Sequence, residues 1–495
     1  MPANMESIRK KIVVVGSGNA GLMAALILQT KFPHYFLSVI SSKDIGIIGV
    51  GEGTTEHFND FLRYCKINVY SFIKEAGATF KAGIMFQGWS EEDYLHSVET
   101  MFKYKDGEYS SYYSHLMANE HYSKELTTMP TWDNEYVFKH FKQNYGIIHH
   151  QYHADTFKLN NFLKTIAKNR GIKFFEDEII GHQLKENGDI ELIKGKKLNY
   201  EGEYFIDCSG QKRILGGKIY NTPLKSMKDY LILNRAFAFQ TEHGEDNYNL
   251  WTRARAMNAG WNWQIPTQER YGNGYVYCDE FITEKEAIKE IEKIYKQKIK
   301  VGRSFSFEPM YTTETWTHNC ISIGLASNFV EPLEATSMGS TIQQMFTLIS
   351  FLGSDDKKSF NKHCNIIYEN LCDFILLHYL VKKENTPFWK HIKYNLKITD
   401  SLKPYLETSK RRLLQRLDFP LSFHLFGCDN FNLVMYGLRL FPFPAIKKEW
   451  RNTLAPFQQR DIDAHVLHYH RVKQGAQKIT HKKAIELIKE RGGRI

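Results

Sequence analysis

Three glycines near the start of the chain have the spacing of a phosphate-binding turn. They form the pattern G-x-G-x-x-G directly after the β-branched run from Lys11 to Val15, and a helix-forming stretch from Leu22 to Gln29 follows. In such a turn the first glycine permits the tight bend, the second admits a pyrophosphate, and the third lets helix and strand pack closely. The helix start would bind phosphates through its N–H groups and dipole. The predicted contacts with a dinucleotide are Gly16, Ser17, Gly18, Ala20 and Gly21.

The residue that would hold the ribose of this dinucleotide is unusual. In dinucleotide-binding folds the second strand commonly ends in an acid that accepts the ribose hydroxyls. Here the predicted strand from Tyr35 to Ile40 is followed by Ser41. Two alternatives stay open: the Ser41 hydroxyl replaces the carboxylate as a weaker partner, or Asp44 reaches the ribose.

A single lysine, Lys81, interrupts an otherwise apolar segment from Thr79 to Phe86. By itself such a lysine is more often a surface residue whose stem lies along apolar groups.

Two further strings are rich in glycine or tryptophan. The stretch from Ile48 to Thr54 is glycine-dense and apolar, which suits a backbone strap against a flat ring, although an ordinary surface loop is the alternative. The string Trp261-Asn262-Trp263-Gln264-Ile265-Pro266 combines two tryptophans with a proline, all residues of low background frequency. Its alternative interpretation is an aromatic pair in the core of a sheet.

Taken together, these strings resemble the flavin-dependent halogenases, in the tryptophan-halogenase branch. Lys81 matches the K-x-G segment of that family, Trp261 to Pro266 fits W-x-W-x-I-P, and Gly51 to Thr54 resembles the G-E-A/G-T strap. The run from Glu331 to Thr336 resembles E-P-L-E-S-T, with Ala335 in place of the serine. The match extends from about Lys11 to Trp389.

The resemblance implies a role for each matching residue. Lys81 and Glu334 would be the catalytic pair. The three donors of the lysine would hold and orient the oxidant. Glu334 would accept a proton, or, as the alternative, merely pair with Lys81. Further FAD contacts would come from Gly51, Glu52, Gly53, Gly324 and Leu325. The halide would lie at Thr336 and Ser337, and a barrier between flavin and substrate would be formed by Trp261, Trp263 and Pro266. A metal site is not expected.

The implied activity is halogenation of an electron-rich aromatic substrate of indole or phenol type. Reduced FAD, O2 and a halide ion would generate hypohalous acid, which Lys81 would hold. Chloride or bromide is the expected halide, with iodide as a further candidate. Because the sequence shows no nicotinamide-binding module, a separate flavin reductase would supply reduced FAD.

The same resemblance implies an α/β fold with a Rossmann-like FAD-binding module of the flavin-monooxygenase type. We expect this module over residues 1–350, with insertions near 95–150 and 221–320. The second insertion shows strand-like alternation and would form a sheet. Residues 351–495 would form a largely helical substrate-side domain, in which no counterpart of the family's tryptophan-clasping segment is recognisable.

Composition narrows the class of protein further. Hydrophobic residues make up 42% and charged residues 24% of the 495 positions, as in a globular protein that needs no membrane. The net charge of +10 is concentrated in late runs such as His481-Lys482-Lys483, which we interpret as a solvated basic face rather than a nucleic-acid site. Seven scattered cysteines predict a reduced, cytoplasmic location. A homo-oligomer is permitted.

Two rival functions remain. A flavin-dependent aromatic monooxygenase would share the nucleotide turn but would not need Lys81, the W-x-W-x-I-P string or Glu334. A non-catalytic flavoprotein that binds nucleic acid would use the basic end of the chain, and its binding would fall steeply with salt. No recognised RNA- or DNA-binding module supports this second rival.

Overall fold

The computed structural model describes most of the chain as two compact units. The described residues are 10–42, 49, 51–81, 83–97, 131–133, 151–243, 248–420, 424–441, isolated positions between 444 and 460, and 478–491. The first unit comprises residues 1–78, 154–228 and 308–369, and the second comprises 79–153, 229–307 and 370–495. Each unit is therefore assembled from three separate stretches of chain.

The first unit is built on a six-stranded sheet with the order β21-β22-β13-β1-β2-β9. Its strands are β1 (Lys11–Val15), β2 (Phe36–Ser41), β9 (Lys173–Glu176), β13 (Tyr204–Asp207), β21 (Trp316–Thr317) and β22 (Cys320–Ser322). All neighbours pair in parallel except β21 and β22. Nearly all of β1 is buried, which explains why its sequence is continuously apolar rather than alternating.

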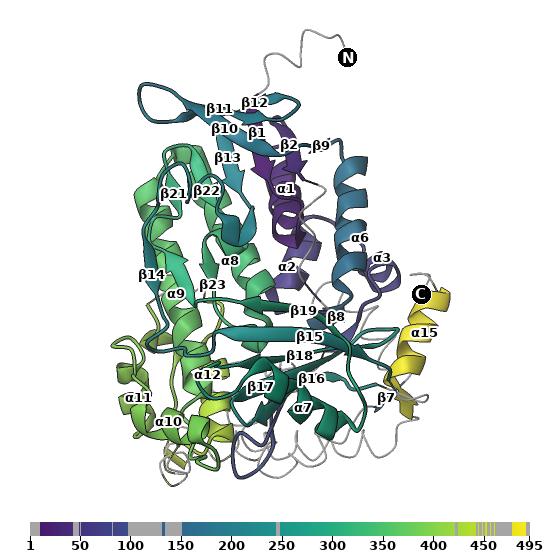
Figure 1. The fold of residues 1–495 in the computed structure, drawn as a ribbon, viewed down its shortest axis with the longest axis vertical. Helices are drawn as coiled ribbons and strands as arrows, with labels where there is room; N and C mark the ends of the chain where they lie inside the picture. Colours follow the sequence, from purple (N-terminus) through teal and green to yellow (C-terminus); the bar gives the residue numbers. More distant parts are fainter. Residues whose placement is uncertain are drawn as a thin grey trace. The chain divides into compact units, whose positions relative to one another are not determined.

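Helices lie beside this sheet (Figure 1). They are α1 (Asn19–Lys31), α2 (His57–Tyr64), α3 (Val69–Glu75), α6 (Thr156–Asn169) and α8 (Thr336–Phe351). Helix α1 contacts both α6 and α8, and eight consecutive residues from Gly21 to Leu28 are buried. A helix that is apolar on all sides belongs in a protein interior. The long apolar run after β1 is thus a covered core helix.

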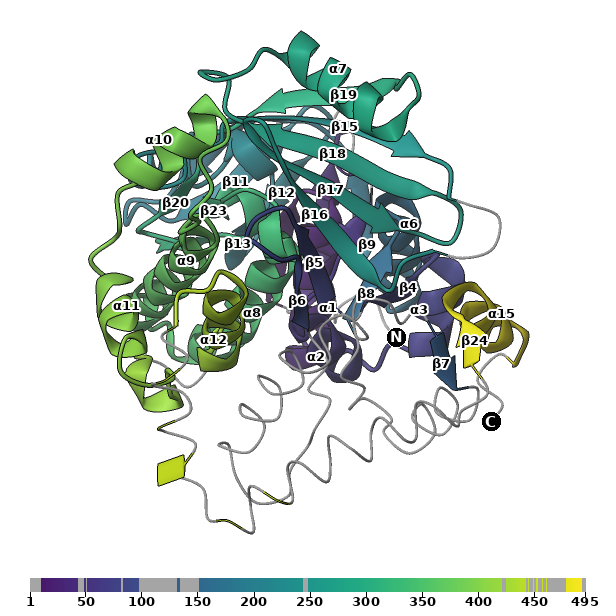
Figure 2. The ribbon, with the colours of Figure 1, turned by 90° about the horizontal axis from the view of Figure 1, so that it is seen from below.

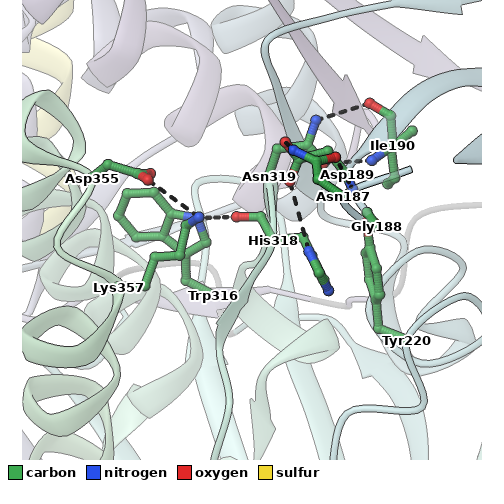
Figure 3. Close-up of polar contacts among 10 residues, drawn as sticks. All are labelled: Asn187, Gly188, Asp189, Ile190, Tyr220, Trp316, His318, Asn319, Asp355 and Lys357. Atoms are coloured by element: carbon green, nitrogen blue, oxygen red, sulfur yellow. Dashed lines mark hydrogen bonds and ion pairs between the residues drawn. The ribbon is translucent and has the colours of Figure 1, made fainter. Parts of the chain in front are cut away.

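Two small sheets complete the first unit. One contains β10 (Ile179–Leu184), β11 (Ile190–Gly195) and β12 (Asn199–Glu201), and the other contains β14 (Leu224–Ser226), β20 (Met310–Thr312) and β23 (Asn328–Phe329). The side chain of Asn319 joins the first of these to the main sheet (Figure 3), since its amide accepts from the backbone N–H of Ile190 at 2.8 Å and donates to the carbonyl at 2.9 Å. Asn319 thereby acts like a strand partner for β11.

The second unit contains a seven-stranded sheet with the order β19-β15-β18-β17-β16-β5-β6. The strands are β5 (Gly83–Gln87), β6 (Tyr94–Ser97), β15 (Arg235–Thr241), β16 (Trp251–Met257), β17 (Gly260–Pro266), β18 (Tyr271–Tyr277) and β19 (Val301–Ser306). Only β5 and β16 pair in parallel. A short antiparallel ladder joins β4 (Thr79–Lys81) to β8 (Gln151–Ala154).

Helix α7 (Glu284–Tyr295) lies along one side of the seven-stranded sheet (Figure 2). Its N-terminus is a capping box in which Thr283 and Glu286 satisfy each other's backbone N–H groups. Ala287 and Ile291 pack into an aromatic cluster with Phe237 and other side chains of the sheet. The remaining elements of this unit are β7 (Thr131–Asp133), α10 (Pro387–Asn395), α11 (Lys403–Ser409), α12 (Cys428–Gly437), β24 (Lys478–Thr480) and α15 (His481–Arg491). The division between the units falls inside α9 (Lys357–His378).

The predicted fold class is confirmed. The glycine turn lies between β1 and α1, and the strands predicted within 221–320 form most of the seven-stranded sheet. The described residues after position 350 are largely helical as predicted, although the strand β24 precedes α15. Within the described residues, every helix is too short or too polar to cross a membrane.

Candidate functional site

At two of its three glycines, the glycine turn lies too close to other backbone atoms to admit a side chain. Gly16 has a φ of +116°, and a Cβ there would lie 2.2 Å from the carbonyl oxygen of Cys208, which follows β13. A Cβ on Gly21 would lie 2.0 Å from the carbonyl oxygen of Gly16. Both positions therefore admit only glycine for reasons of packing.

Gly18 differs from the other two glycines. A Cβ at this position would meet no heavy atom of the protein within 4 Å, and its φ of −66° is ordinary for any residue. Helix α1 begins directly after it, with no side-chain cap and no acidic residue in its first turn among the described residues. Space beside the backbone and a helix start without an acid fit the pyrophosphate of a dinucleotide.

Asn160 of α6 holds this turn and was not identified from the sequence. Its side-chain amide donates to the backbone carbonyl of Ser17 at 2.9 Å and to Oδ1 of Asn19 at 3.1 Å. The amide thus ties the loop to a second helix. The G-x-G-x-x-G pattern contains no signal for a partner about 140 residues away in the chain.

The predicted flavin strap is organised around Thr156, the first residue of α6. The Thr156 hydroxyl accepts from the backbone N–H of Gly51 at 3.1 Å and donates to a carboxylate oxygen of Glu52 at 3.5 Å. A Cβ on Gly49 would lie 2.4 Å from the same hydroxyl oxygen. Desolvation raises the pKa of the Glu52 carboxyl to about 7, so this group is partly protonated at neutral pH. The strand β3 (Glu52–Gly53) contacts the short turn that contains Glu334.

Gly324 and Leu325 lie in a 3-10 turn just after β22. Gly324 has a φ of +65°, and a Cβ there would lie 2.9 Å from the Cβ of Ala20 in the first turn of α1. The Gln344 side chain donates to the carbonyl of Ser322 at 2.6 Å and accepts weakly from the N–H of Gly324 at 3.4 Å. The structure therefore brings the third stretch of the first unit against the glycine turn.

Glu334 occupies a backbone conformation that is rare for residues with a side chain. Glu334 and Ala335 have φ values of +66° and +55°, in the left-handed region, and the Glu334 side chain is buried with 4% exposure. Each such residue costs about 1 to 2 kcal/mol relative to the right-handed conformation. Strain of this kind is concentrated at functional sites. The local geometry is thus consistent with the role that the resemblance implied for Glu334.

Helix α8 starts directly after these two residues. Its first two residues are Thr336, which is buried, and Ser337, which is exposed. Within the described part of the chain its N-terminus has no side-chain cap, and its first turn lacks an acidic residue. The positive end of a helix dipole is compatible with a halide ion here.

The ribose partner remains a prediction. Ser41 is the last residue of β2, and its carbonyl accepts from the N–H of Asp177 at 3.1 Å. The carboxylate of Asp177 accepts from the Tyr200 hydroxyl at 2.9 Å and from the backbone N–H groups of Lys197 and Leu198, which lie between β11 and β12. Asp44 lies outside the described residues.

Lys81 is buried in the second unit, with 1% of its surface exposed. It is the last residue of β4 and lies opposite Gln151 in the ladder with β8. Its Nζ donates to Oε1 of Gln151 at 2.9 Å. The alternative interpretation of a surface lysine with a buried stem is wrong, because the amine itself is inside the protein.

The lysine strand is joined to the W-x-W-x-I-P strand. The Thr79 hydroxyl donates to the carbonyl of Pro266, the last residue of β17, at 2.8 Å. On the same side of the ladder, the His153 ring contacts the Thr79 hydroxyl at 3.4 Å and the Thr252 hydroxyl at 2.9 Å. Burial, together with the charge of Lys81, lowers the pKa of His153 well below its usual value. His153 is therefore a neutral ring at physiological pH.

Trp261 and Trp263 are both buried in β17, with ring centroids 6.1 Å apart. The Trp263 ring lies over Gly274 of the neighbouring strand, where a Cβ would come within 2.0 Å of it. Asn262, between them, donates to the carbonyl of Gly274 at 2.7 Å and accepts from the Tyr295 hydroxyl at 3.0 Å. The strand is thus held rigidly on both of its faces.

A separate polar cleft of about 680 Å³ lies in the first unit and includes none of the predicted site residues. Its charges pair with one another at its surface: Lys10 with Glu203 at 3.2 Å, and Lys357 with Asp355 at 3.2 Å. His318 stacks on Tyr220 and lies 3.7 Å from Asp189 (Figure 3). Exposed ion pairs of this kind are screened by solvent. We therefore interpret this cleft as a group of solvent-exposed ion pairs around Asn319 and not as an active site.

Comparison with known proteins agrees with this architecture. A family model described as tryptophan halogenase matches residues 11–449. A tryptophan 7-halogenase of Lentzea aerocolonigenes is 27% identical over 440 residues, which is 80% of this chain and 81% of that protein. A tryptophan 6-halogenase of Streptomyces albogriseolus is 28% identical over 455 residues, 83% of each chain. The crystal structure of a tryptophan halogenase from Shewanella frigidimarina has a TM-score of 0.87 at 24% identity and covers 99% of both chains, and it shares the fold.

Proposed function

We propose that this chain, which belongs to the tryptophan halogenase family and is a flavin-dependent halogenase, halogenates an electron-rich aromatic ring of indole or phenol type. Its requirements would be reduced FAD, O2 and a chloride or bromide ion, with iodide as a further candidate. The single observation that carries the catalytic assignment is the buried amine of Lys81, held by Gln151 at 2.9 Å. A monooxygenase would have no use for a lysine in that position.

The first unit would hold FAD. Its pyrophosphate would lie beside Gly18 and the start of α1, and the strap of Gly51, Glu52 and Gly53 would contact the flavin ring system. Gly324 and Leu325 would close the same site. When bound in its reduced form, FAD would supply two electrons to O2. The halide would supply the other two as it is oxidised to hypohalous acid.

Lys81 would bind hypohalous acid through hydrogen bonds from its amine. Such a bond to the oxygen atom of HOX makes that oxygen a better leaving group, which increases the electrophilicity of the halogen. Gln151 fixes the position of the amine. The rate of halogenation would therefore depend mainly on how hypohalous acid is oriented and less on how tightly it is bound. Burial also keeps bulk water from taking the oxidant away.

Glu334 would take the proton that the ring loses. The ring carbon forms its bond to the halogen as the O–X bond breaks, and the oxygen leaves as water with a proton from the Lys81 ammonium group, which the proton later lost by the ring replaces. The ring then loses its own proton to the Glu334 carboxylate and becomes aromatic again. The net reaction is ArH plus HOX giving ArX plus H2O.

Three further assignments complete the proposal. Thr336 and Ser337 at the start of α8 would bind the halide. Trp261, Trp263 and Pro266 would form the barrier between the flavin and the aromatic substrate. A separate flavin reductase would deliver reduced FAD. The natural substrate is a small aromatic molecule, and relatives of nearly equal identity that are named as 7- and 6-halogenases offer no preference for one ring position.

Mass spectrometry of an indole incubated with the protein, FAD, a flavin reductase, NADH and either chloride or bromide tests this function. The halogen isotope pattern in the product is the expected result. A mass gain of one oxygen atom instead would assign the protein to the monooxygenases. An unchanged indole and an unchanged phenol, with O2 consumed, would contradict the proposed substrate class.

A further inference from the structure

The C-terminal helix contributes a buried histidine to the strand that carries Lys81. His481 is the first residue of α15, and only 2% of its surface is exposed. Its Nε2 accepts a hydrogen bond from the backbone N–H of Phe80 at 3.0 Å, across a sequence separation of 401 residues. The interpretation of His481 as part of a solvated basic run was therefore wrong, because the ring is enclosed by protein.

The hydrogen bonds of His481 define its protonation. Since the N–H of Phe80 donates to Nε2, this nitrogen carries no proton, and the proton lies on Nδ1, which faces the carbonyl of Asn249 at 3.1 Å. The ring is also stacked on Phe80 and in edge contact with Tyr248 at a centroid distance of 4.7 Å. Burial lowers the pKa of His481 to about 3, which keeps the ring neutral and its Nε2 an acceptor.

The contact has a direct consequence for Lys81. In β4 the N–H of Phe80 bonds to His481 and so points away from the partner strand β8. This N–H belongs to the peptide between Thr79 and Phe80, and Lys81 is the next residue of the strand. Because the strand backbone sets the direction of each side chain, a rotation of that peptide would also redirect the Lys81 side chain. His481 secures the open edge of β4, while Gln151 holds the tip of the lysine on the other strand.

We propose that His481 is a positioning residue for the halogenation step, which acts by fixing the Phe80 peptide and hence the direction of the Lys81 amine. The proposal rests on the proposed role of Lys81 as the residue that holds hypohalous acid. It makes the extreme C-terminal helix a part of the catalytic apparatus, although His481 touches neither oxidant nor substrate. Loss of this contact would let hypohalous acid escape without slowing its formation.

Two substitutions of His481 separate its two hydrogen bonds. Glutamine places its terminal amide where the Nε2 of histidine lies and can accept from the Phe80 N–H. Asparagine is shorter, reaches only the position of Nδ1 and can retain the bond to Asn249. The matched control is His243→Gln, because His243 also packs against Tyr248 but bonds to the carbonyl of Thr267 instead of to β4.

The experiment measures halogenated indole formed per O2 consumed, with escaped hypohalous acid trapped by a chemical scavenger and FAD affinity measured for each variant. His481→Asn and His481→Ala should lower product per O2 about tenfold or more, since a misplaced catalytic group costs up to about 100-fold. The amount of trapped hypohalous acid should rise by as much as the halogenated product falls. FAD affinity should be unchanged. His481→Gln and His243→Gln should stay within about threefold of the wild type.

Two results would overturn the inference. One is wild-type product per O2 in His481→Asn, and the other is an equal loss in His481→Gln and His481→Asn, which would exclude the Nε2 acceptor as the cause. If His481→Ala does not fold, the Gln and Asn pair decides the question. Lys81→Ala in the same assay separates this inference from the proposed function. If Lys81→Ala halogenates at the wild-type yield, the lysine mechanism fails. If Lys81→Ala is inactive while His481→Asn is fully active, only the role of His481 is refuted.

Discussion

The nucleotide turn of the first unit and the lysine site of the second are built in opposite ways. In the turn, Gly16 and Gly21 are required because a Cβ would collide with backbone oxygens at 2.2 and 2.0 Å. In the lysine site, Lys81 is held by the Gln151 side chain from 70 residues away, and its neighbour Phe80 is held by His481 from 401 residues away. Backbone shape decides which residues the turn admits, although Asn160 also ties it to α6, whereas hydrogen bonds to distant side chains hold the lysine site.

This contrast predicts how each site fails. A side chain added to the turn acts sterically, so it destroys either the fold or the space for the ligand. Removal of the Lys81 side chain leaves the main chain in place and should affect a chemical step. The following substitutions test the two sites separately.

The largest expected effects come from the glycines of the turn. Gly18→Val should fold normally yet lower FAD affinity by about 100-fold or more, equivalent to about 2.8 kcal/mol, because its side chain would enter the space beside α1. Gly21→Val should instead reduce the free energy of unfolding by roughly 2 to 5 kcal/mol. Flavin titration and chemical denaturation of both variants measure this. Undiminished flavin affinity in folded Gly18→Val would mean that the pyrophosphate lies elsewhere.

Glu334 should show a large catalytic effect with little effect on binding. Glu334→Gln retains the shape but removes the basicity, so product formation should fall by about 100-fold, within the range for a general base. Glu334→Gly is the matched backbone control, because glycine adopts a φ of +66° without strain and should raise the unfolding free energy by up to about 1 kcal/mol while also losing product. A fully active Glu334→Gly variant would show that only the turn, and not the carboxylate, is needed.

The tryptophan strand should give a smaller effect. Trp263→Phe leaves a gap above Gly274 and should cost roughly 1 to 2 kcal/mol of stability. Product formation should fall less than about tenfold, because neither ring acts chemically. Complete loss of halogenation in a well-folded Trp261→Phe or Trp263→Phe variant would assign these rings a direct part in the reaction.

A pH dependence of the free energy of unfolding has the smallest bearing on halogenation, and both units contribute to it. Burial lowers the pKa of His481 to about 3 and that of His57 in α2 to about 4, against about 6.5 when unfolded. At these two rings the unfolded chain therefore binds more protons than the folded chain below pH 6.5. The stability that they contribute above that pH is lost as pH falls towards 4 and 3, by about 1.4 kcal/mol per pH unit for each ring. The Glu52 carboxyl, whose pKa is raised from 4.5 to about 7, acts in the opposite sense between those two values. Urea unfolding of apoprotein from pH 7 to 5 measures how steeply the free energy of unfolding changes with pH. In His481→Gln this slope should lose the contribution of one titrating group, about 1.4 kcal/mol per pH unit. An equal slope in that variant would mean that His481 is already charged in the folded state.

The sequence was informative where local backbone rules determine the structure. The G-x-G-x-x-G turn, the apolar strand before it and the helix after it follow from spacing and composition, and they are found as predicted. The burial of Lys81 could be inferred only through the resemblance, since an isolated lysine is usually exposed. Thr156, Asn160 and Gln151 were missed because no short-range pattern reports a hydrogen bond between residues 70 to 143 positions apart.

His481 is the clearest case of a residue whose environment the local sequence does not predict. Beside two lysines near the end of the chain, a histidine has every local property of a solvated residue. Only tertiary packing turns its ring inward to the edge of β4. Local charge patterns therefore describe the exposed residues Lys483 and Glu490 of α15 well and its first residue badly.

The central claim is that Lys81 acts after the flavin has done its chemistry. The direct measurement is Lys81→Ala, supplied with reduced FAD, O2, bromide and an indole, beside Lys74→Ala of the exposed face of α3 as control. We predict normal FAD affinity and O2 consumption, no brominated product, and wild-type product in the control. Bromination by Lys81→Ala at the wild-type rate, or loss of its flavin oxidation together with product, would contradict the account.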